Sequence, residues 1–193
     1  MRIKWFSLIR ITGLLLVLLY HFFQTIFPGG FFGVDVFFTF SGFLITSLLL
    51  EEFGKASQID LLGFFKRRFY RIVPPVVLMV LVTMPFTFLV RQDYVAGIGG
   101  QIAGVLGFMT NFYEMLTGGS YESQFIPHLF VHNWSLAVEV HYYILWGLAV
   151  WFLSKRSKSS SQLRGMVFLL SAGAFIISFF SMFIGSLMAS SYS

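Results

Sequence analysis

The chain contains no cysteine, and its 193 residues include only 13 lysines and arginines and 8 aspartates and glutamates. The absence of cysteine excludes disulfide bridges, thiolate metal sites and a cysteine nucleophile. Charged residues make up 11% of the sequence, whereas soluble globular domains contain about 25%. Hydrophobic residues make up 57% and aromatic residues 20%. This composition predicts an integral membrane protein, because it leaves too few polar side chains to face water.

Long apolar runs predict which helices cross the bilayer. A hydrocarbon core of about 30 Å needs a helix of about 20 apolar residues. The first run is too long for the apolar core of a signal peptide, and no small-residue cleavage site precedes Pro28, so we expect it to be retained as a span. We therefore predict an all-α, multi-pass transmembrane helical bundle. Its five spans are expected at about 5–27, 31–50, 76–90, 134–153 and 166–189.

Two further segments are expected to lie at or in the membrane without crossing it. Asp60 is a predicted N-cap, and the residues after it place an apolar face opposite a basic face, which predicts a cytoplasmic interfacial helix over about 60–73. The Pro74-Pro75 pair is expected to end this helix and to start the next span. The apolar stretch 98–113 is interrupted by glycines, and we expect it to re-enter the membrane rather than cross it.

The basic residues predict the orientation of the bundle. Eleven of the thirteen fall into three clusters, and cytoplasmic loops carry an excess of Lys and Arg. Re-entry of 98–113 keeps all three clusters on one side of the membrane, so we expect a protein of the cell (plasma) membrane with a cytoplasmic N-terminus. Because the clusters lie between apolar runs, they do not indicate nucleic-acid binding. They are Arg2 and Lys4; Lys55, Lys66, Arg67, Arg68 and Arg71; and Lys155, Arg156, Lys158 and Arg164.

An ionisable residue in a predicted span costs about 2.5 to 3.5 kcal/mol, and four such residues are candidates for a function. Arg10 and His21 are eleven residues apart, so a helix places them on nearly one face and about 16 Å apart along its axis. Asp35 and Glu139 are expected in the same outer half of the membrane as His21. One hypothesis is a buried His21 flanked by carboxylates, one of which orients the imidazole while its other nitrogen takes a proton from a hydroxyl. The alternatives are a structural polar cluster and, for Arg10, a side chain that reaches the nearby interface.

The basic residues of the predicted interfacial helix also admit two interpretations. Lys66, Arg67, Arg68 and Arg71 either attract anionic lipid, which composition alone favours, or bind a phosphorylated cosubstrate, because guanidinium groups match phosphate geometry.

Two histidines and one serine carry side chains that could bind a metal or act as a nucleophile. His128 and His132 have the spacing of two zinc ligands on one helix, but Pro127 and the loop-like context argue against a rigid metal site, so no metal is predicted. Ser41 lacks the strand-turn-helix setting of a nucleophile elbow, and we expect it to pack or to form a hydrogen bond within the bundle.

Four ordered blocks resemble the acyltransferase type-three family of membrane proteins. They are Arg10 with His21; GVDVFF at 33–38 with SGFLI at 41–45; FFKRRFYRIVP at 64–74; and WSLAVE at 134–139. The resemblance implies transfer of an acyl group, usually acetyl from cytoplasmic acetyl-CoA, to a hydroxyl of an extracytoplasmic sugar. It implies His21 as the catalytic base, Arg10 as its partner, and Arg68 with Arg71 at the acyl-CoA site. The other candidates at or beside motif positions are Asp35 and Glu139 for catalysis, and Arg67, Ser41, Trp134 and Ser135 for substrate binding.

The sequence departs from the family pattern after Glu139, where Val140-His141 replaces the usual acidic residue and Gln, and it covers about the first half of the usual bundle. The expected function is that of a membrane O-acyltransferase, with acyl-CoA as cosubstrate and no bound cofactor. Membrane lipid, a carbohydrate acceptor, and the second half of the bundle or an esterase-like domain are the expected partners. The alternatives are a truncated, inactive fragment of such an enzyme and a small-solute transporter, which would predict repeated half-structures of opposed topology.

Overall fold

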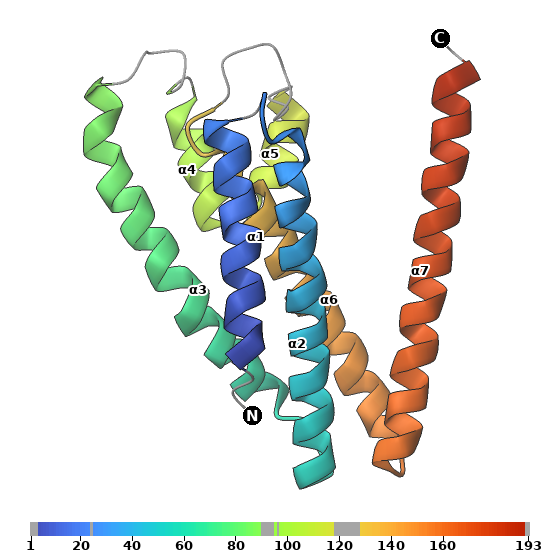
Figure 1. Ribbon diagram of the computed structural model, residues 1–193. Helices are drawn as coiled ribbons and strands as arrows, with labels where there is room; N and C mark the ends of the chain where they lie inside the picture. The colour runs from blue at the N-terminus through green and yellow to red at the C-terminus, as the bar shows by residue number, and fades with distance from the viewer. Residues whose placement is uncertain (1–3, 24, 90–94, 96, 118–127, 192–193) are drawn as a thin grey trace. The chain divides into compact units, whose positions relative to one another are not determined.

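The computed structural model of the protein is helical, with no β-strand among the described residues (Figure 1). The structure describes residues 4–23, 25–89, 95, 97–117 and 128–191, and the side chains of these residues apart from 4–7, 10, 88 and 188–191. The chain forms two compact units. The first comprises Met1–Ile45 and Asp60–Gly147, and the second comprises Thr46–Ile59 and Leu148–Ser193. The prediction of an all-α protein is confirmed.

Two antiparallel helices begin the first unit. α1 runs over Lys4–Phe22, a 3₁₀ turn, η1, reverses the chain over Pro28–Phe32, and α2 runs over Gly33–Ala56. A Cβ atom at Gly33 would lie 2.5 Å from the carbonyl oxygen of Gly13, so the backbones of α1 and α2 meet closely at this glycine. In lipid no hydrophobic effect drives helices together, so they associate through the close van der Waals packing that small residues allow.

α3 begins at the predicted N-cap. It runs over Leu61–Thr83 and is followed by a 3₁₀ segment, η2, over Met84–Leu89. The side chain of Asp60 accepts a hydrogen bond from the Gly63 backbone N–H at 2.9 Å. The candidate span Leu61–Thr87 contains 27 residues and is about 40 Å long, so its first turns extend beyond a hydrocarbon core about 30 Å thick. An interfacial location of these basic first turns stays a prediction.

The prediction that Pro74-Pro75 ends a helix was wrong, because both prolines lie inside α3. Each proline lacks a backbone N–H, so the carbonyl groups of Tyr70 and Arg71 lose their usual helical donors. In water this loss commonly ends a helix. In lipid the neighbouring backbone groups have no water to bind, so a helix that continues on both sides of the prolines leaves fewer of them unsatisfied.

α4 over Ile98–Leu106 and α5 over Thr110–Thr117 form a tight helical hairpin. Phe108 adopts a positive φ of 53° in the turn between them. α4 has nine residues and α5 has eight. These lengths correspond to about 14 and 12 Å, so neither helix can cross a core of about 30 Å. The segment 98–113 therefore does not cross as one helix, and its re-entry into the membrane stays a prediction.

The chain then returns through a short 3₁₀ turn, η4, over Val131–Asn133 into α6 over Trp134–Arg156. Buried side chains from α3, from α4 and from the residue before η4 form one apolar core in the first unit, so the hairpin and the start of α6 pack on the second half of α3. These core residues are Val76, Val80, Val105 and Phe130.

The second unit consists of the ends of α2 and α6 together with α7 over Ser160–Ser191. At the start of α7 the Ser159 hydroxyl accepts a hydrogen bond from the Gln162 backbone N–H at 3.2 Å, as an N-cap does. The large apolar side chains of α7 are mostly exposed, as expected for a helix that faces lipid. The buried apolar side chains of this unit are Leu49, Phe53, Ile59, Val150, Leu163 and Val167.

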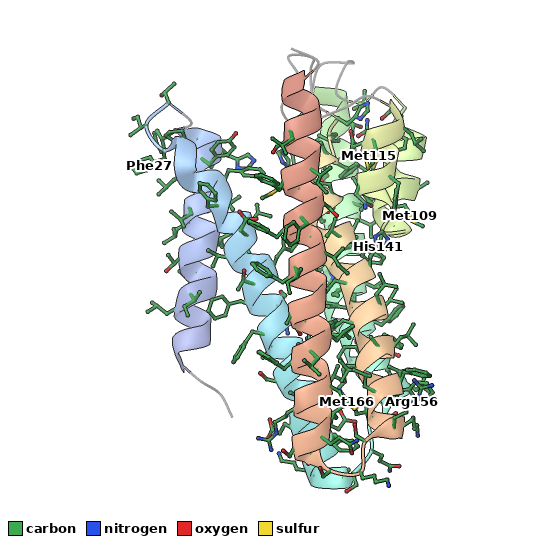
Figure 2. All side chains as sticks on the ribbon, turned by 90° about the vertical axis from the view of Figure 1, so that its right-hand side faces the viewer. Phe27, Met109, Met115, His141, Arg156 and Met166 are labelled. Carbon is green, nitrogen blue, oxygen red and sulfur yellow. The ribbon has the colours of Figure 1, made fainter. Side chains whose placement is uncertain are left out.

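Four helices among the described residues are long and apolar enough to cross a membrane. They are Pro28–Ala56, Leu61–Thr87, Val131–Arg156 and Ser160–Leu187. α1 has 19 residues with a shorter apolar part, so the fifth predicted span stays a prediction. Large apolar side chains, among them Phe27, Met109 and Met115, are exposed on the first unit (Figure 2). The chain is therefore a helical membrane bundle, as its composition predicted.

The close approach at Gly33 gives a test of the α1–α2 packing. Gly33→Ala is expected to lower the free energy of unfolding by about 1 to 3 kcal/mol, because the added methyl group meets the Gly13 carbonyl and the Val17 side chain. The measurement is thermal unfolding in detergent micelles. Gly29→Ala is the matched control, since its Cβ would have Phe32 as nearest neighbour at 4.0 Å. Equal unfolding temperatures for the two variants would contradict this packing.

Candidate active site

The carboxylate of Glu139 is the centre of a polar cluster inside the first unit. Glu139 lies in the second turn of α6 and is partly buried. Its Oε1 accepts a hydrogen bond from the Ser41 hydroxyl of α2 and another from the Tyr143 hydroxyl, one turn further along α6. Ser41 and Tyr143 are only 7% and 8% exposed. Because an ionised carboxylate can only accept hydrogen bonds, these two hydroxyl groups supply the donors that its burial requires.

Arg68 of α3 adds a positive charge to this cluster. Its guanidinium group contacts two aromatic rings, with Cζ 5.6 Å from the centre of the Phe64 ring and 5.7 Å from the centre of the Tyr143 ring. Cations are attracted to the faces of such rings, more strongly where water is excluded. Tyr143 therefore contacts the carboxylate through its hydroxyl and the guanidinium through its ring.

A pocket of about 300 Å³ lies beside the cluster, between α2, α3 and α6. This volume is at the lower end of the range for small-molecule sites, about 300 to 1,000 Å³. Apolar side chains of the same three helices complete its wall. The pocket can therefore hold a small group, with cations available for an anion and hydroxyl groups for a polar atom. Its polar lining residues are Ser41, Arg68, Arg71, Glu139 and Tyr143.

The pocket brings together groups that were predicted at opposite sides of the membrane. Arg68 and Arg71 were expected at the cytoplasmic boundary, and Glu139 in the outer half. α3 and α6 run in opposite directions (Figure 1), and each has 23 residues. Arg71 lies about 15 Å along α3 from one end, and Tyr143 about 14 Å along α6 from the other. Both positions are near the middle of their helices, where long side chains close the remaining distance.

The other predicted residues of α6 lie at its start. The indole of Trp134 packs edge to face on Phe38 of α2, with ring centroids 6.3 Å apart. The Ser135 hydroxyl donates to the His132 carbonyl at 3.4 Å. Trp134 therefore helps to join α6 to α2, whereas the bond of Ser135 is local to the start of α6. The predicted part of both residues in substrate binding stays a prediction.

The imidazole of His21 lies outside the lining of this pocket, in the last turn of α1. Its Nδ1 is 2.7 Å from the carbonyl oxygen of Val17, one turn earlier. A carbonyl oxygen can only accept, so Nδ1 carries the hydrogen and Nε2 of the neutral ring holds a lone pair. The ring meets that of His132 edge to face, with centroids 4.9 Å apart. An imidazole with this tautomer can act as a proton acceptor at Nε2.

The prediction of a buried His21 was wrong, because the residue is exposed in the last turn of its helix. The hydrogen bond that orients the ring comes from a backbone carbonyl and not from a carboxylate. Asp35 lies exposed in the first turn of α2, where an acidic side chain stabilises the helix start. Arg67 is exposed on α3. Arg10 belongs to α1, but its side chain lies outside the described residues.

The part that two residues, Tyr143 and His132, have in these clusters was not predicted from the sequence. Tyr143 follows Glu139 by four residues, so the helical spacing of neighbouring side chains could have identified it. The sequence spacing of His132 pairs it with His128 as a possible zinc ligand and gives no sign of its contact with His21. The two histidines do not share a helix: His128 precedes η4 and bonds to a carboxylate of α5, whereas His132 lies within η4 against His21.

A helical membrane bundle with a small charged pocket and an imidazole that can accept a proton has the features of an integral membrane enzyme. Comparison with known proteins gives its family: the family described as acyltransferase domain matches residues 3–192, and the chain belongs to it. This confirms the resemblance carried by the four sequence blocks.

Relatives within this family are longer than the chain. The O-acetyltransferase OatA of Staphylococcus aureus (strain NCTC 8325 / PS 47) is 33% identical over 171 residues, which cover 88% of this chain and 28% of that protein. OatA of Staphylococcus aureus (strain MRSA252) matches to the same extent. The chain therefore spans less than a third of the length of these curated relatives. No solved structure matches it.

Replacement of Glu139 tests whether its carboxylate holds the cluster together. Glu139→Leu is expected to lower the free energy of unfolding by about 2 to 4 kcal/mol, because the Ser41 and Tyr143 hydroxyls lose their acceptor inside the bundle. Glu139→Gln keeps one acceptor oxygen and is expected to lower the free energy of unfolding by only about 1 kcal/mol. Thermal unfolding in micelles measures both. If the two variants unfold alike, these hydrogen bonds do not support the fold.

Proposed function

We propose that this protein is a membrane O-acyltransferase that moves an acyl group, acetyl in the first instance, from cytoplasmic acyl-CoA to a hydroxyl of an extracytoplasmic carbohydrate. The observation that carries the proposal is the pocket in which two arginines of α3 share a wall with the hydroxyl and carboxylate groups of α2 and α6. The relatives named O-acetyltransferase OatA support an acetyl group and an oxygen acceptor.

The arginines of α3 are the proposed site for the phosphates of the donor. Arg68 and Arg71 line the pocket, while Lys66 and Arg67 are exposed on the same helix. Guanidinium groups bind phosphate oxygens through paired, charge-assisted hydrogen bonds. The excess of basic residues here supports a cytoplasmic location for the start of α3 and for the N-terminus, in the plasma membrane. Acyl-CoA would then bind from the side on which the cell makes it.

His21 is the proposed general base. Its Nε2 takes the proton of the acceptor hydroxyl while the hydroxyl oxygen attacks the thioester carbon. The new carbon–oxygen bond forms, the carbon–sulfur bond breaks, and the thiolate leaves with the electron pair. Arg10 is the proposed partner of His21 on α1.

His21→Ala tests the general base. We expect acyl transfer to fall by about 10² to 10⁴-fold, the usual contribution of proton transfer in the transition state. The measurement is incorporation of labelled acetyl from acetyl-CoA by membranes that contain the protein as the cell produces it, at matched protein level. His141→Gln is the control, because His141 is a second imidazole, on α6 beside Phe112 (Figure 2), and should keep activity. Retained activity in His21→Ala would refute the assignment.

Arg68→Lys tests the donor site. The variant keeps the positive charge but loses the planar group that packs on Phe64 and Tyr143 and pairs with phosphate. KM for acetyl-CoA is expected to rise about tenfold, which corresponds to about 1.4 kcal/mol. Arg164→Lys makes the same chemical change at an exposed arginine of the second unit and should leave KM unchanged. An unchanged KM in Arg68→Lys would remove this arginine from the donor site.

A further inference from the structure

A second imidazole, that of His132, lies against the proposed general base. The rings of His21 and His132 meet edge to face at 73°, with centroids 4.9 Å apart. Both residues are exposed, one in the last turn of α1 and the other in η4, just before α6. The pair therefore places two groups that can each accept and release a proton side by side at the surface of the first unit.

We infer that His132 is the proton partner of His21 and takes over the proton that His21 receives from the acceptor hydroxyl. This inference rests on the proposed function. The Val17 carbonyl keeps the hydrogen of the neutral His21 ring on Nδ1, so the incoming proton arrives at Nε2 and leaves His21 as an imidazolium. The neighbouring ring is a second imidazole, so it can take up this proton at a ring nitrogen of its own.

The proton balance closes over one turnover. The proton moves from the hydroxyl oxygen to His21, from His21 to His132, and from His132 to the aqueous phase on the outer side, where the proposed orientation puts this end of α1. The thiolate that leaves the donor takes up a proton from water on its own side. Both imidazoles are neutral again when the next acceptor binds, and no further reactant is needed.

The segment that carries His132 is anchored on the α4–α5 hairpin by two side-chain hydrogen bonds. His128 Nδ1 is 2.8 Å from Oε2 of Glu114 on α5. The backbone N–H of Phe130 donates to Oε1 of Gln101 on α4 at 3.3 Å. Glu114 and Gln101 are 7% and 1% exposed, so both bonds are shielded from water. The hairpin therefore fixes the chain immediately before His132.

Glu114 and Gln101 are positioning residues in this scheme. They act through the short backbone segment 128–133, which is itself held by hydrogen bonds from Val131 N–H to the His128 carbonyl at 3.1 Å and from Asn133 N–H to the Phe130 carbonyl at 3.0 Å. A shift of this segment would move His132 relative to His21. The inference thus gives the α4–α5 hairpin a role in proton transfer.

His132→Ala is the direct test, with His141→Ala as the matched control. We expect kcat for acetyl transfer to fall about 10- to 100-fold while KM for acetyl-CoA stays unchanged, because proton transfer is impaired and the donor site is intact. Free imidazole added to the assay should restore most of the lost kcat, since a small base can enter the exposed position. His141→Ala should show neither the loss nor the response to imidazole.

Three results would overturn the inference. A kcat within about twofold of the unchanged protein would show that His21 needs no partner. A loss that imidazole does not reverse would give His132 a structural role only. A protein that transfers no acetyl group at all would overturn the proposed function together with this inference, whereas loss of activity in His21→Ala with full activity in His132→Ala would overturn the inference alone.

Glu114 variants test the positioning role. Glu114→Ala removes the acceptor of the His128 bond, and we expect kcat to fall about tenfold. Glu114→Gln keeps an acceptor oxygen and should lose much less, at equal protein level in the membrane. In a His132→Ala background, Glu114→Ala should cause no further loss of kcat, because both changes act on one proton transfer. Losses that multiply would overturn the positioning role.

Discussion

A carboxylate inside a lipid-facing bundle is stable only where hydrogen-bond donors reach it. Glu139 meets this condition through two hydroxyl groups, one from Ser41 on α2 and one from Tyr143 on its own helix. The hydrogen bond to Ser41 fixes the register of α6 against α2, and the Tyr143 ring fixes the guanidinium of Arg68 on α3. Residues of α2, α3 and α6 are thereby brought together around one acid. The pocket lies beside this arrangement, and Ser41, Glu139 and Tyr143 form part of its polar wall together with Arg68 and Arg71.

The α4–α5 hairpin is likewise held to the rest of the first unit by hydrogen bonds of polar side chains. Its helices are too short to cross the membrane, so its polar groups must find partners within the first unit. Gln101 and Glu114 do so by bonding to the segment 128–133, which returns the chain to α6. These two hydrogen bonds also hold the chain immediately before His132, whose ring lies against His21 of α1.

The sequence predicts the local features of this fold well, because apolar run length and capping residues act over a few turns. α2, α6, α7 and the Asp60 cap follow from such signals. The proline pair misled the prediction because its effect depends on the surrounding solvent, and lipid favours a continued helix where water would end it. The bond between Ser41 and Glu139 joins residues 98 positions apart, and no single helix pattern contains the register between two helices. For the same reason the contact between His21 and His132 could not be predicted from the sequence. The four-residue spacing of His128 and His132 instead indicated that those two histidines form a pair.

The chemistry of the described groups divides the proposed reaction between two places. A guanidinium stays protonated at any physiological pH, so Arg68 and Arg71 can bind anions and stabilise charge but cannot accept a proton. The hydroxyls of Ser41 and Tyr143 already donate hydrogen bonds to Glu139. Uptake of a proton by Glu139 or by these hydroxyls would therefore disturb the hydrogen bonds that hold the pocket together. The Nδ1 hydrogen of the neutral His21 ring is directed to the Val17 carbonyl, so this ring accepts a proton at Nε2. In the proposed reaction, His21 at the end of α1 therefore accepts the proton, and Arg68 and Arg71 in the pocket between α2, α3 and α6 bind the phosphates of the donor.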